Sequence, residues 1–326
     1  MSGNQVDLSV IIVSYNNRNL LRDCLDAVES SVGEYTYETI IVDNGSTDDT
    51  SQWLRKEYPK VNLVTEEKNL GFAGANNVGF SHAKGRYWVI LNTDAIVQDN
   101  ALAKAIALMD TNPSVGLGGA RLLGRDGADQ PSALLFPSIL NNILFLTGLA
   151  NKYSQNRFFG RAQRSWADPQ VPASVDWVPG AFSIIRQELV KEMDFFDPRF
   201  FFYYEEVDLC RRIKQAGYTI KYWPQIRVVH FGGEPKQAGD NRVEETLLLW
   251  RMHSELLYYR KHHGRLGAYS SFLLEYGWHF LRSLRHKGFK REQAKKIMKT
   301  KKQAWKDTCG GKRAVLGQGK HQRKSV

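Results

Sequence analysis

The sequence is poor in cysteine and contains no long apolar run. Its 326 residues include Cys24, Cys210 and Cys309, with no CxxC pair, so neither a disulfide framework nor a cysteine zinc site is expected. No segment approaches the roughly 18 consecutive apolar residues of a membrane-spanning helix, and the first residues lack the basic and apolar regions of a signal peptide. We therefore expect a cytoplasmic protein with reduced thiols.

The formal net charge of +11 is unevenly distributed. From Arg251 onward, 20 Lys and Arg stand against 4 Asp and Glu, whereas residues 1–250 are net acidic. Positive charge confined to the C-terminal quarter disfavours a nucleic-acid-binding module, so no nucleic acid partner is expected. An anionic membrane surface fits the basic C-terminus better, because each Lys or Arg near such a surface gains about 1 kcal/mol. A solvated tail is the alternative.

Short β-branched runs alternate with helical patterns in the first 112 residues, which indicates a parallel sheet flanked by helices. The predicted strands are 8–14, 39–43, 61–65 and 87–91, and the predicted helices include 72–84 and 100–110. No GxGxxG follows the first strand, which argues against a dinucleotide-dependent oxidoreductase. Further on, the pattern predicts a helix at 205–217 and a strand at 218–230.

Polar clusters follow three of the predicted strands, at 14–16, 43–46 and 92–94. Ligands of such sheets bind beyond the carboxyl ends of the strands, so one crevice should collect all three clusters. Asp43 and Asp94 would end buried strands, where a carboxylate is costly unless it is paired or meets a ligand. Helix capping is the alternative for Asp43, but residues 46–48 lie nearer the next helix and are better placed as caps.

Four motifs then stand in order: VSYNN (13–17), VDNGSTD (42–48), NLGFAGANNVG (69–79) and LNTDAIV (91–97). Together they resemble the bacterial family 2 glycosyltransferases, particularly rhamnosyltransferase-like members with a GT-A fold, and the resemblance extends to about His230. It implies an α/β, GT-A type fold, with a Rossmann-like, mostly parallel sheet flanked by helices and a C-terminal helical extension. We expect a GT-A domain at 1–240, divided into a nucleotide-binding half (about 1–112) and an acceptor half (113–240). C-terminal helices (241–286) and a partly disordered basic tail (287–326) would follow.

The resemblance implies that Asp43 hydrogen-bonds the pyrimidine of the donor and that the turn after the first strand cradles the nucleotide. Asparagines and glycines of 69–79 suit contacts to ribose, phosphate or sugar, although a turn and helix start would also explain them. The candidate nucleotide-sugar contacts are Ser14, Tyr15, Asn16, Asp43, Asn44, Gly45, Asn69, Gly71, Gly74, Asn76, Asn77, Asn92 and Thr93.

The DxD motif of the family stands here as Asn92-Thr93-Asp94, which implies Asp94 as ligand of a divalent metal, Mn²⁺ or Mg²⁺. Asn92 removes one carboxylate, so metal affinity is lower or the Asn92 carbonyl contacts the metal or ribose. His230 matches the family position that completes the metal site. A lone histidine is more often structural.

The stretch FFFYYEEVDLCRR (200–212) resembles the family segment that carries the catalytic base, which implies Glu206, with Glu205 and Asp208 as alternates. The aromatic residues before it would raise the pKa of that carboxyl, or they are plain core. A solvated acidic helix start is the alternative for the acids. The loop WVPGAF (177–182) resembles the family's acceptor loop, so Trp177, Gly180 and Ala181 are candidate acceptor contacts. A buried structural role is the alternative for the indole.

The resemblance thus implies an inverting, metal-dependent glycosyltransferase. Its donor would be dTDP-rhamnose or a UDP-linked hexose, and its acceptor a hydroxyl of a bacterial cell-surface polysaccharide or lipid-linked glycan. Such an enzyme would work in the cytoplasm, peripherally on the inner face of the cell membrane, and a homodimer through the C-terminal helices is left open. A degenerate member that binds a nucleotide sugar without transferring it is disfavoured, because Asp43, Asp94, Glu206 and His230 are all present.

Overall fold

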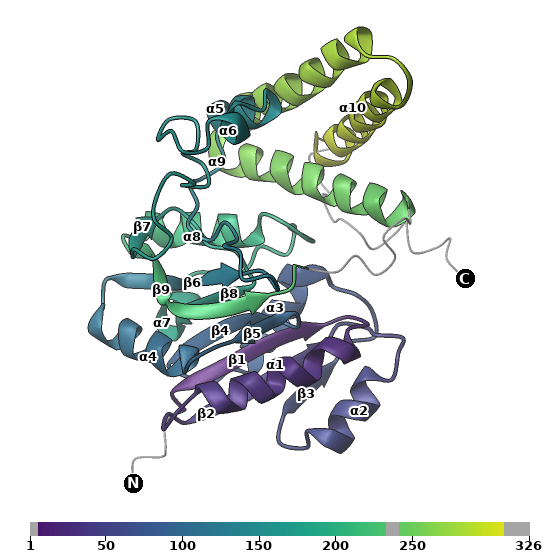
Figure 1. The fold of residues 1–326 in the computed structure, drawn as a ribbon. Helices are drawn as coiled ribbons and strands as arrows, with labels where there is room; N and C mark the ends of the chain where they lie inside the picture. The colour runs from purple at the N-terminus through teal and green to yellow at the C-terminus, as the bar shows by residue number, and fades with distance from the viewer. Residues whose placement is uncertain (1–5, 233–240, 310–326) are drawn as a thin grey trace. The chain divides into compact units, whose positions relative to one another are not determined.

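The computed structural model describes residues 6–232 and 241–309. The strands are β1 (Leu8–Ser14), β2 (Tyr37–Asp43), β3 (Asn62–Thr65), β4 (Tyr87–Asn92), β5 (Ala95–Val97), β6 (Val115–Leu123), β7 (Ala173–Val175), β8 (Phe182–Arg186) and β9 (Thr219–His230). The helices are α1 (Arg18–Ser31), α2 (Thr50–Glu57), α3 (Gly71–His82), α4 (Ala101–Thr111), α5 (Ile139–Leu146), α6 (Leu149–Lys152), α7 (Gln187–Glu192), α8 (Glu205–Gln215), α9 (Asn241–Arg285) and α10 (Gly288–Cys309). Figure 1 labels these elements.

The described residues form two compact units. The first comprises 6–136, 162–197 and 206–232, and the second comprises 137–161, 198–205 and 241–309. Two segments within the expected acceptor half (113–240) group with the C-terminal helices, and the functional division itself stays a prediction. The Asn142 amide on α5 donates to Glu255 on α9 at 3.2 Å, and the Ser254 hydroxyl of α9 donates to the Phe202 carbonyl at 3.0 Å. These bonds hold both segments to α9.

A single sheet runs through the first unit in the order β3-β2-β1-β4-β8-β6-β9-β5, with β7 paired to β9 (Figure 1). Its first half is parallel, since β1 pairs with β2 and β4, and β2 with β3. Beyond β4 the sheet is mixed. The strand β8 is antiparallel to β4 and β6, both β5 and β7 are antiparallel to β9, and β6 is parallel to β9. The fold is α/β and GT-A type, as expected, but the sheet is mixed rather than mostly parallel. The parallel half consists of four strands joined by α1, α2 and α3, and each helix returns the chain to the end of the sheet where the strands begin.

The central strands are apolar on both faces because helices cover both. Leu8, Val10 and Ile12 of β1 belong to a core cluster with residues of α1, α2 and α4. Ile11 lies in a second cluster with residues of α3, α7 and α8. The two cores cover the faces of the sheet. The polar turns begin at the carboxyl ends of β1, β2 and β4, which lie at the same end of the sheet.

The C-terminal helices form most of the second unit. Gly264 has φ 68° and ψ −170°, which breaks α9 into two helical stretches, and α10 packs against α9. Met252 and Leu256 of α9 meet Ala304 of α10 in a small apolar core. Part of the expected basic tail is therefore a packed helix, because α10 carries apolar residues at helical spacing between its lysines. Residues 310–326 lie outside the described residues, so the expectation of disorder there is not tested.

One basic residue of α10 is buried rather than solvated. The Lys301 ammonium pairs with Glu255 at 3.0 Å and with Glu275 at 2.6 Å, and its side chain is fully buried. Burial alone would lower the pKa of Lys301, but the two carboxylates outweigh burial and raise it. This residue therefore cannot contribute to a solvated cationic surface. Within residues 6–232 and 241–309, no helix is both long and apolar enough to cross a bilayer.

Candidate active site

The first two strands end side by side, which brings two polar turns together. Ser14 pairs in register with Asp43, and the Asn44 N–H donates to the Ser14 carbonyl at 2.8 Å. The buried Asp43 carboxylate accepts the Ser46 N–H at 3.0 Å and the Ser51 hydroxyl. It does not cap α2, which begins after Asp49. Asp43 thus shapes the turn from within.

The turn after β1 is locked onto the turn after β2. Asn16 has a left-handed backbone, with φ 53°, which asparagine tolerates. Its N–H donates to the Ser46 hydroxyl at 2.9 Å, and its amide oxygen accepts the Thr47 N–H at 2.8 Å. Tyr15 is exposed between these anchors. Among the described residues, the buried Ser14 hydroxyl has no hydrogen-bond partner, so it is free to meet a ligand.

The asparagine- and glycine-rich segment closes onto the same turns. The Asn44 amide donates to Asn69 at 3.1 Å and accepts the Leu70 N–H at 2.8 Å. Gly45 has φ 79°, and a Cβ there would lie 2.7 Å from the Lys68 carbonyl carbon. Only glycine fits this approach. The three segments are therefore fastened together before any ligand binds.

Two neighbouring asparagines within α3 differ in how far their amides are engaged inside the protein. Both amide atoms of Asn77 bond to the Phe196 backbone, at 2.8 and 3.0 Å. The Asn76 amide donates to the Phe72 carbonyl at 2.9 Å, while its buried oxygen has no hydrogen-bond partner among the described residues. A Cβ on Gly74 would lie 3.0 Å from the Leu70 Cβ. We therefore leave Asn77 out of the proposed nucleotide contacts and retain Asn76.

The turn after β4 brings together the two expected metal ligands. Asn17 at the start of α1 donates to the Thr93 hydroxyl at 3.2 Å, which orients the turn. Next along the chain, β5 pairs with β9 so that Ala95 stands opposite His230. His230 Nε2 lies 3.4 Å from Asp94 Oδ1, and both side chains are largely buried. Sequence distance gives no hint of this approach, so the sheet register alone creates the pair.

Gln130 supports this pair, and its role was missed from the sequence. Its amide nitrogen donates to the His230 carbonyl at 2.9 Å, and its amide oxygen lies 2.9 Å from His230 Nδ1. A proton on Nδ1 makes that contact a hydrogen bond and leaves the Nε2 lone pair toward Asp94. Gln130 lies in the turn after β6, within an unremarkable polar stretch, and no sequence pattern distinguishes it.

The donor set fits a divalent cation that is completed by substrate or water oxygens. An imidazole nitrogen and a carboxylate oxygen converge, and Gln130 holds the histidine from behind. Within residues 6–232 and 241–309, no cluster of three or more His, Cys, Asp and Glu side chains is placed for a metal. Two protein ligands are compatible with Mn²⁺ or Mg²⁺ at nucleotide sites, where phosphate and water supply the remaining oxygens.

Glu206 lies in the first turn of α8. Burial raises the pKa of its carboxyl to about 7, although hydrogen bonds from its own backbone and that of Gly180 act in the opposite direction. Next to Gly180, the Ala181 carbonyl accepts the Asn92 N–H at 3.1 Å. Through this loop the carboxylate is tied to the turn that carries Asp94. A pKa near neutrality suits a general base.

The two alternates are in different surroundings. Asp208 is fully buried and pairs with Arg212 at 2.8 Å, and Arg212 also donates to the Asp194 carbonyl at 2.6 Å. Its carboxylate is thereby engaged in holding α8. Glu205 is buried and groups with the second unit. Glu206 is the residue of the three whose environment suits proton abstraction.

The aromatic residues before α8 group with the second unit. The Phe201 and Trp250 rings lie 4.6 Å apart, and Tyr204 lies 5.6 Å from Tyr258 of α9. Tyr203 and Tyr204 have φ of 70° and 68°, a left-handed pair immediately before the helix. Such outliers cost about 1–3 kcal/mol each and mark places that the fold constrains.

The candidate acceptor loop is held by its indole. The Trp177 ring N–H donates to the Leu135 carbonyl at 3.0 Å, and the ring packs partly into the core. A Cβ on Gly180 would touch the Phe72 ring at 3.4 Å, so this glycine leaves little spare space. These contacts support the alternative of a structural tryptophan, and a sugar contact by Trp177 stays a prediction.

Comparisons with known proteins agree on one class. The sequence pattern of Glycosyl transferase family 2 matches residues 9–171. The N-acetylglucosaminyl-diphospho-decaprenol L-rhamnosyltransferase of Mycobacterium tuberculosis is 27% identical over 234 residues, which cover 68% of this chain and 75% of that protein. The low-salt glycan biosynthesis hexosyltransferase Agl10 of Haloferax volcanii is 23% identical over 234 residues, which cover 69% of this chain and 67% of that protein.

Two solved structures share the fold. The mannosyltransferase PcManGT from Pyrobaculum calidifontis, solved with GDP-Man and Mn²⁺, aligns with a TM-score of 0.53 at 18% identity, over 93% of this chain and 75% of that one. GalNAc-T7, solved with UDP, GalNAc and Mn²⁺, aligns with a TM-score of 0.56 at 14% identity. The alignment covers 94% of this chain and 57% of that one. At these identities the likeness concerns the fold alone.

Proposed function

This chain belongs to glycosyl transferase family 2, and we propose that it is a metal-dependent, inverting enzyme that transfers a hexose to a glycan hydroxyl. The donor we favour is dTDP-rhamnose, because the rhamnosyltransferase of M. tuberculosis is similar over most of the chain. A UDP-linked hexose is the second candidate. The observation that carries the proposal is the 3.4 Å approach of His230 to Asp94 beside the joined turns after β1, β2 and β4.

The turns are proposed to hold the nucleotide. Asp43 would accept a hydrogen bond from the pyrimidine ring N–H while Ser46 and Ser51 keep its carboxylate in place. The exposed Tyr15 offers a ring face to the base, and the free Ser14 hydroxyl offers a polar contact. Because hydrogen bonds already fasten the turns together, little ordering accompanies binding.

Asp94 and His230 are the residues that would hold the cation, with Asn92 close enough in sequence to add its carbonyl. A bound Mn²⁺ or Mg²⁺ supplies positive charge that stabilises the departing nucleoside diphosphate. Gln130 keeps the Nε2 nitrogen of His230 available for that task.

Glu206 is the proposed general base. Its carboxylate accepts the proton of the acceptor hydroxyl as the hydroxyl oxygen forms a bond to the anomeric carbon. The bond between that carbon and the diphosphate oxygen breaks on the opposite face, which inverts the configuration. The Gly180 N–H holds the carboxylate in position.

The acceptor is proposed to be a lipid-linked glycan or a nascent surface polysaccharide, by analogy with the decaprenol-linked substrate in the name of the M. tuberculosis relative. A lipid-linked acceptor would place the enzyme peripherally on the inner face of the membrane, with the basic C-terminus near anionic lipid. Truncation after residue 309 tests whether the last residues contribute to membrane binding. The truncation keeps α10, because α10 is part of a packed core.

Calorimetric titration with dTDP, UDP, GDP and NAD, each with and without Mn²⁺, tests the proposal. We expect Mn²⁺-dependent binding of dTDP or UDP, which also identifies the donor base. His230→Ala should abolish the Mn²⁺ dependence, whereas the control His82→Ala, on the exposed end of α3, should retain it. Absence of binding for all four nucleotides would refute the proposal. Binding without donor hydrolysis or transfer would favour a nucleotide-sugar-binding protein that has lost catalysis.

A further inference from the structure

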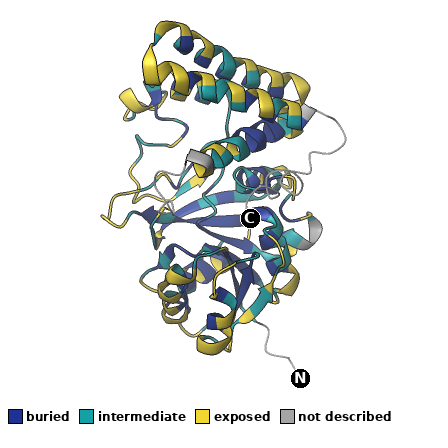
Figure 2. Ribbon diagram, turned by 90° about the vertical axis from the view of Figure 1, so that its right-hand side faces the viewer, coloured by how far each residue is buried: buried dark blue, intermediate teal, exposed yellow. Residues whose placement is uncertain are grey.

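The second helical stretch of α9 exposes a row of large apolar side chains. Leu266 is 81% exposed and Leu284 is 66% exposed. The row, which we call the apolar stripe, consists of Leu266, Tyr269, Leu273, Phe280, Leu281 and Leu284. Successive members are three, four, seven, one and three residues apart, which places all six on one side of the helix. Figure 2 shows exposed positions in yellow along α9 and α10.

The fold of this unit does not need the stripe. The opposite face of the same helical stretch is the buried one, with Ala268, Ser271, Glu275 and His279 turned into the unit. Glu275 pairs there with Lys301 of α10. Packing therefore uses mainly the opposite face; within the stripe, the Tyr269 ring lies 5.9 Å from the Trp305 ring of α10, and Tyr269 is still 49% exposed. A contiguous exposed apolar surface of this kind usually marks an interaction site.

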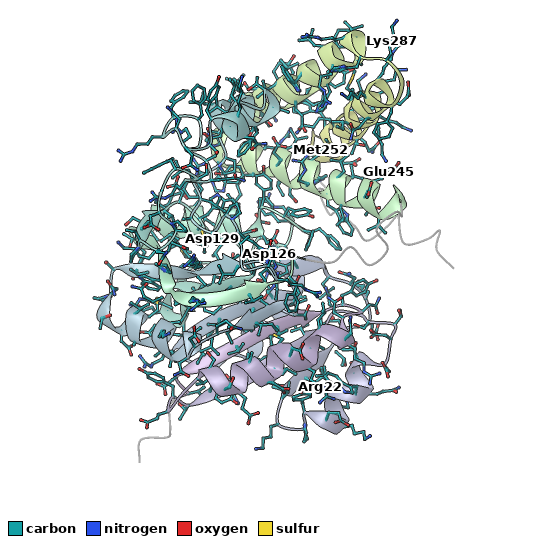
Figure 3. All side chains as sticks on the ribbon, viewed as in Figure 1. Arg22, Asp126, Asp129, Glu245, Met252 and Lys287 are labelled. Atoms are coloured by element: carbon teal, nitrogen blue, oxygen red, sulfur yellow. The ribbon has the colours of Figure 1, made fainter. Side chains whose placement is uncertain are left out.

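Exposed cations stand at both ends of the stripe. Arg265 precedes it, and Arg285, Lys287, Lys290 and Arg291 follow it, all exposed. Figure 3 labels Lys287 at the turn between α9 and α10. The single acidic residue between 264 and 291 is the buried Glu275. The surface thus combines apolar side chains with a border of one sign of charge.

The apolar stripe with its cationic border favours some binding partners over others. A second copy of the chain would bring the same cationic border against itself, which is unfavourable unless salt screens it. An anionic bilayer surface offers an apolar interior for the stripe and negative headgroups for the border. We propose that the apolar stripe docks on the surface of an anionic lipid bilayer, with the second stretch of α9 lying in the plane of the interface.

This inference rests on the lipid-linked acceptor of the proposed function and gives it a specific contact surface. It also differs from binding by a basic tail alone. A purely electrostatic contact is lost in high salt, whereas inserted leucine and phenylalanine side chains keep a bound fraction there. The stripe and the tail can therefore be separated by experiment.

Flotation of the full-length protein with vesicles tests the inference, using phosphatidylcholine alone or an equimolar mixture with phosphatidylglycerol. We expect binding to the anionic vesicles, partly resistant to salt. The triple variant Leu266→Gln, Leu281→Gln, Leu284→Gln should lower the partition coefficient about a hundredfold, because three leucines no longer leave water. The triple variant Arg285→Gln, Lys287→Gln, Lys290→Gln should reduce the preference for anionic vesicles by a similar factor.

Val171→Gln, which removes an exposed apolar side chain from the first unit, is the matched control and should bind vesicles as the parent protein does. Parent-like vesicle binding by the leucine variant would overturn the inference. So would sedimentation equilibrium that shows a dimer lost in the leucine variant, since the stripe would then be an interface between copies. Donor hydrolysis, measured without vesicles, should persist in the leucine variant, and its absence from the parent protein would refute the proposed function separately.

Discussion

Replacing Glu206 by glutamine tests the mechanism at its centre. The amide keeps the size and the hydrogen-bond acceptor but cannot take a proton, so only the base is removed. General base catalysis contributes about 10²- to 10⁴-fold, and we expect turnover to fall by that factor. Donor binding should be unchanged, because the turns that hold the nucleotide come from β1, β2 and β4.

The raised pKa of Glu206 also predicts a pH profile for the parent enzyme. With the carboxyl titrating at about 7, the ionised fraction and therefore kcat should rise about tenfold between pH 6 and pH 8. The Glu206→Gln variant should show a flat residual rate over the same interval. A profile governed by an ordinary glutamate would already be level at pH 6.

The raised pKa of Glu206 also predicts that the protein becomes less stable over the pH range in which its activity rises. Because the folded protein holds the Glu206 proton more tightly than the unfolded chain, the contribution to stability is complete below about pH 4.5 and is lost as the pH rises to about 7. A shift of this size corresponds to about 3 kcal/mol at most. Glu206→Gln should thus raise the free energy of unfolding at pH 8 and leave it nearly unchanged at pH 4.5.

The assay pairs initial rates of donor turnover with urea unfolding, both measured across the pH range. Glu206→Asp serves as the conservative comparison, since it retains a base that is shorter by one methylene and should keep partial activity. Near-parental turnover in Glu206→Gln, together with a large loss in Glu205→Gln, would refute the assignment and move the base one residue earlier.

Other variants test the supporting structure. Gln130→Leu should weaken Mn²⁺ affinity by about 10- to 100-fold in a calorimetric titration with nucleotide, while His230→Ala should remove it, because Gln130 only orients the ligand; equal affinity in Gln130→Leu and parent would contradict this role. Gly45→Ala should destabilise the fold by more than about 1 kcal/mol and weaken nucleotide binding, since the left-handed backbone and the close approach both exclude a side chain; parental unfolding midpoints would argue against it. Lys301→Met should cost about 3–5 kcal/mol in urea unfolding because two buried carboxylates lose their partner, whereas the exposed Lys302→Met should cost little; similar values for the two would show that burial of Lys301 is unimportant.

The class of protein and the parallel half of the sheet could be predicted from the sequence. Hydrophobic periodicity reports which residues leave water, and the first four strands with their helices depend on that local pattern. The turns after β1, β2 and β4 followed because parallel strands place their carboxyl ends at one edge. The metal pair was inferred through the family resemblance and stays a prediction, while the sheet register brings His230 within 3.4 Å of Asp94.

The mixed half of the sheet, the second unit and the roles of single polar residues were decided by tertiary structure. Strand direction beyond β4, the assignment of 137–161 and 198–205 to the C-terminal helices, and the burial of the aromatic stretch all depend on contacts between distant segments.

Polar side chains show the same division. Gln130, Asn77 and Lys301 carry no local signal, since an amide or an ammonium can be solvated, structural or catalytic with the same neighbours in sequence. Residue type and spacing thus determined the family and the site residues it implies. Only packing, which sets burial and the partners across the sheet and between helices, decided what each polar group does.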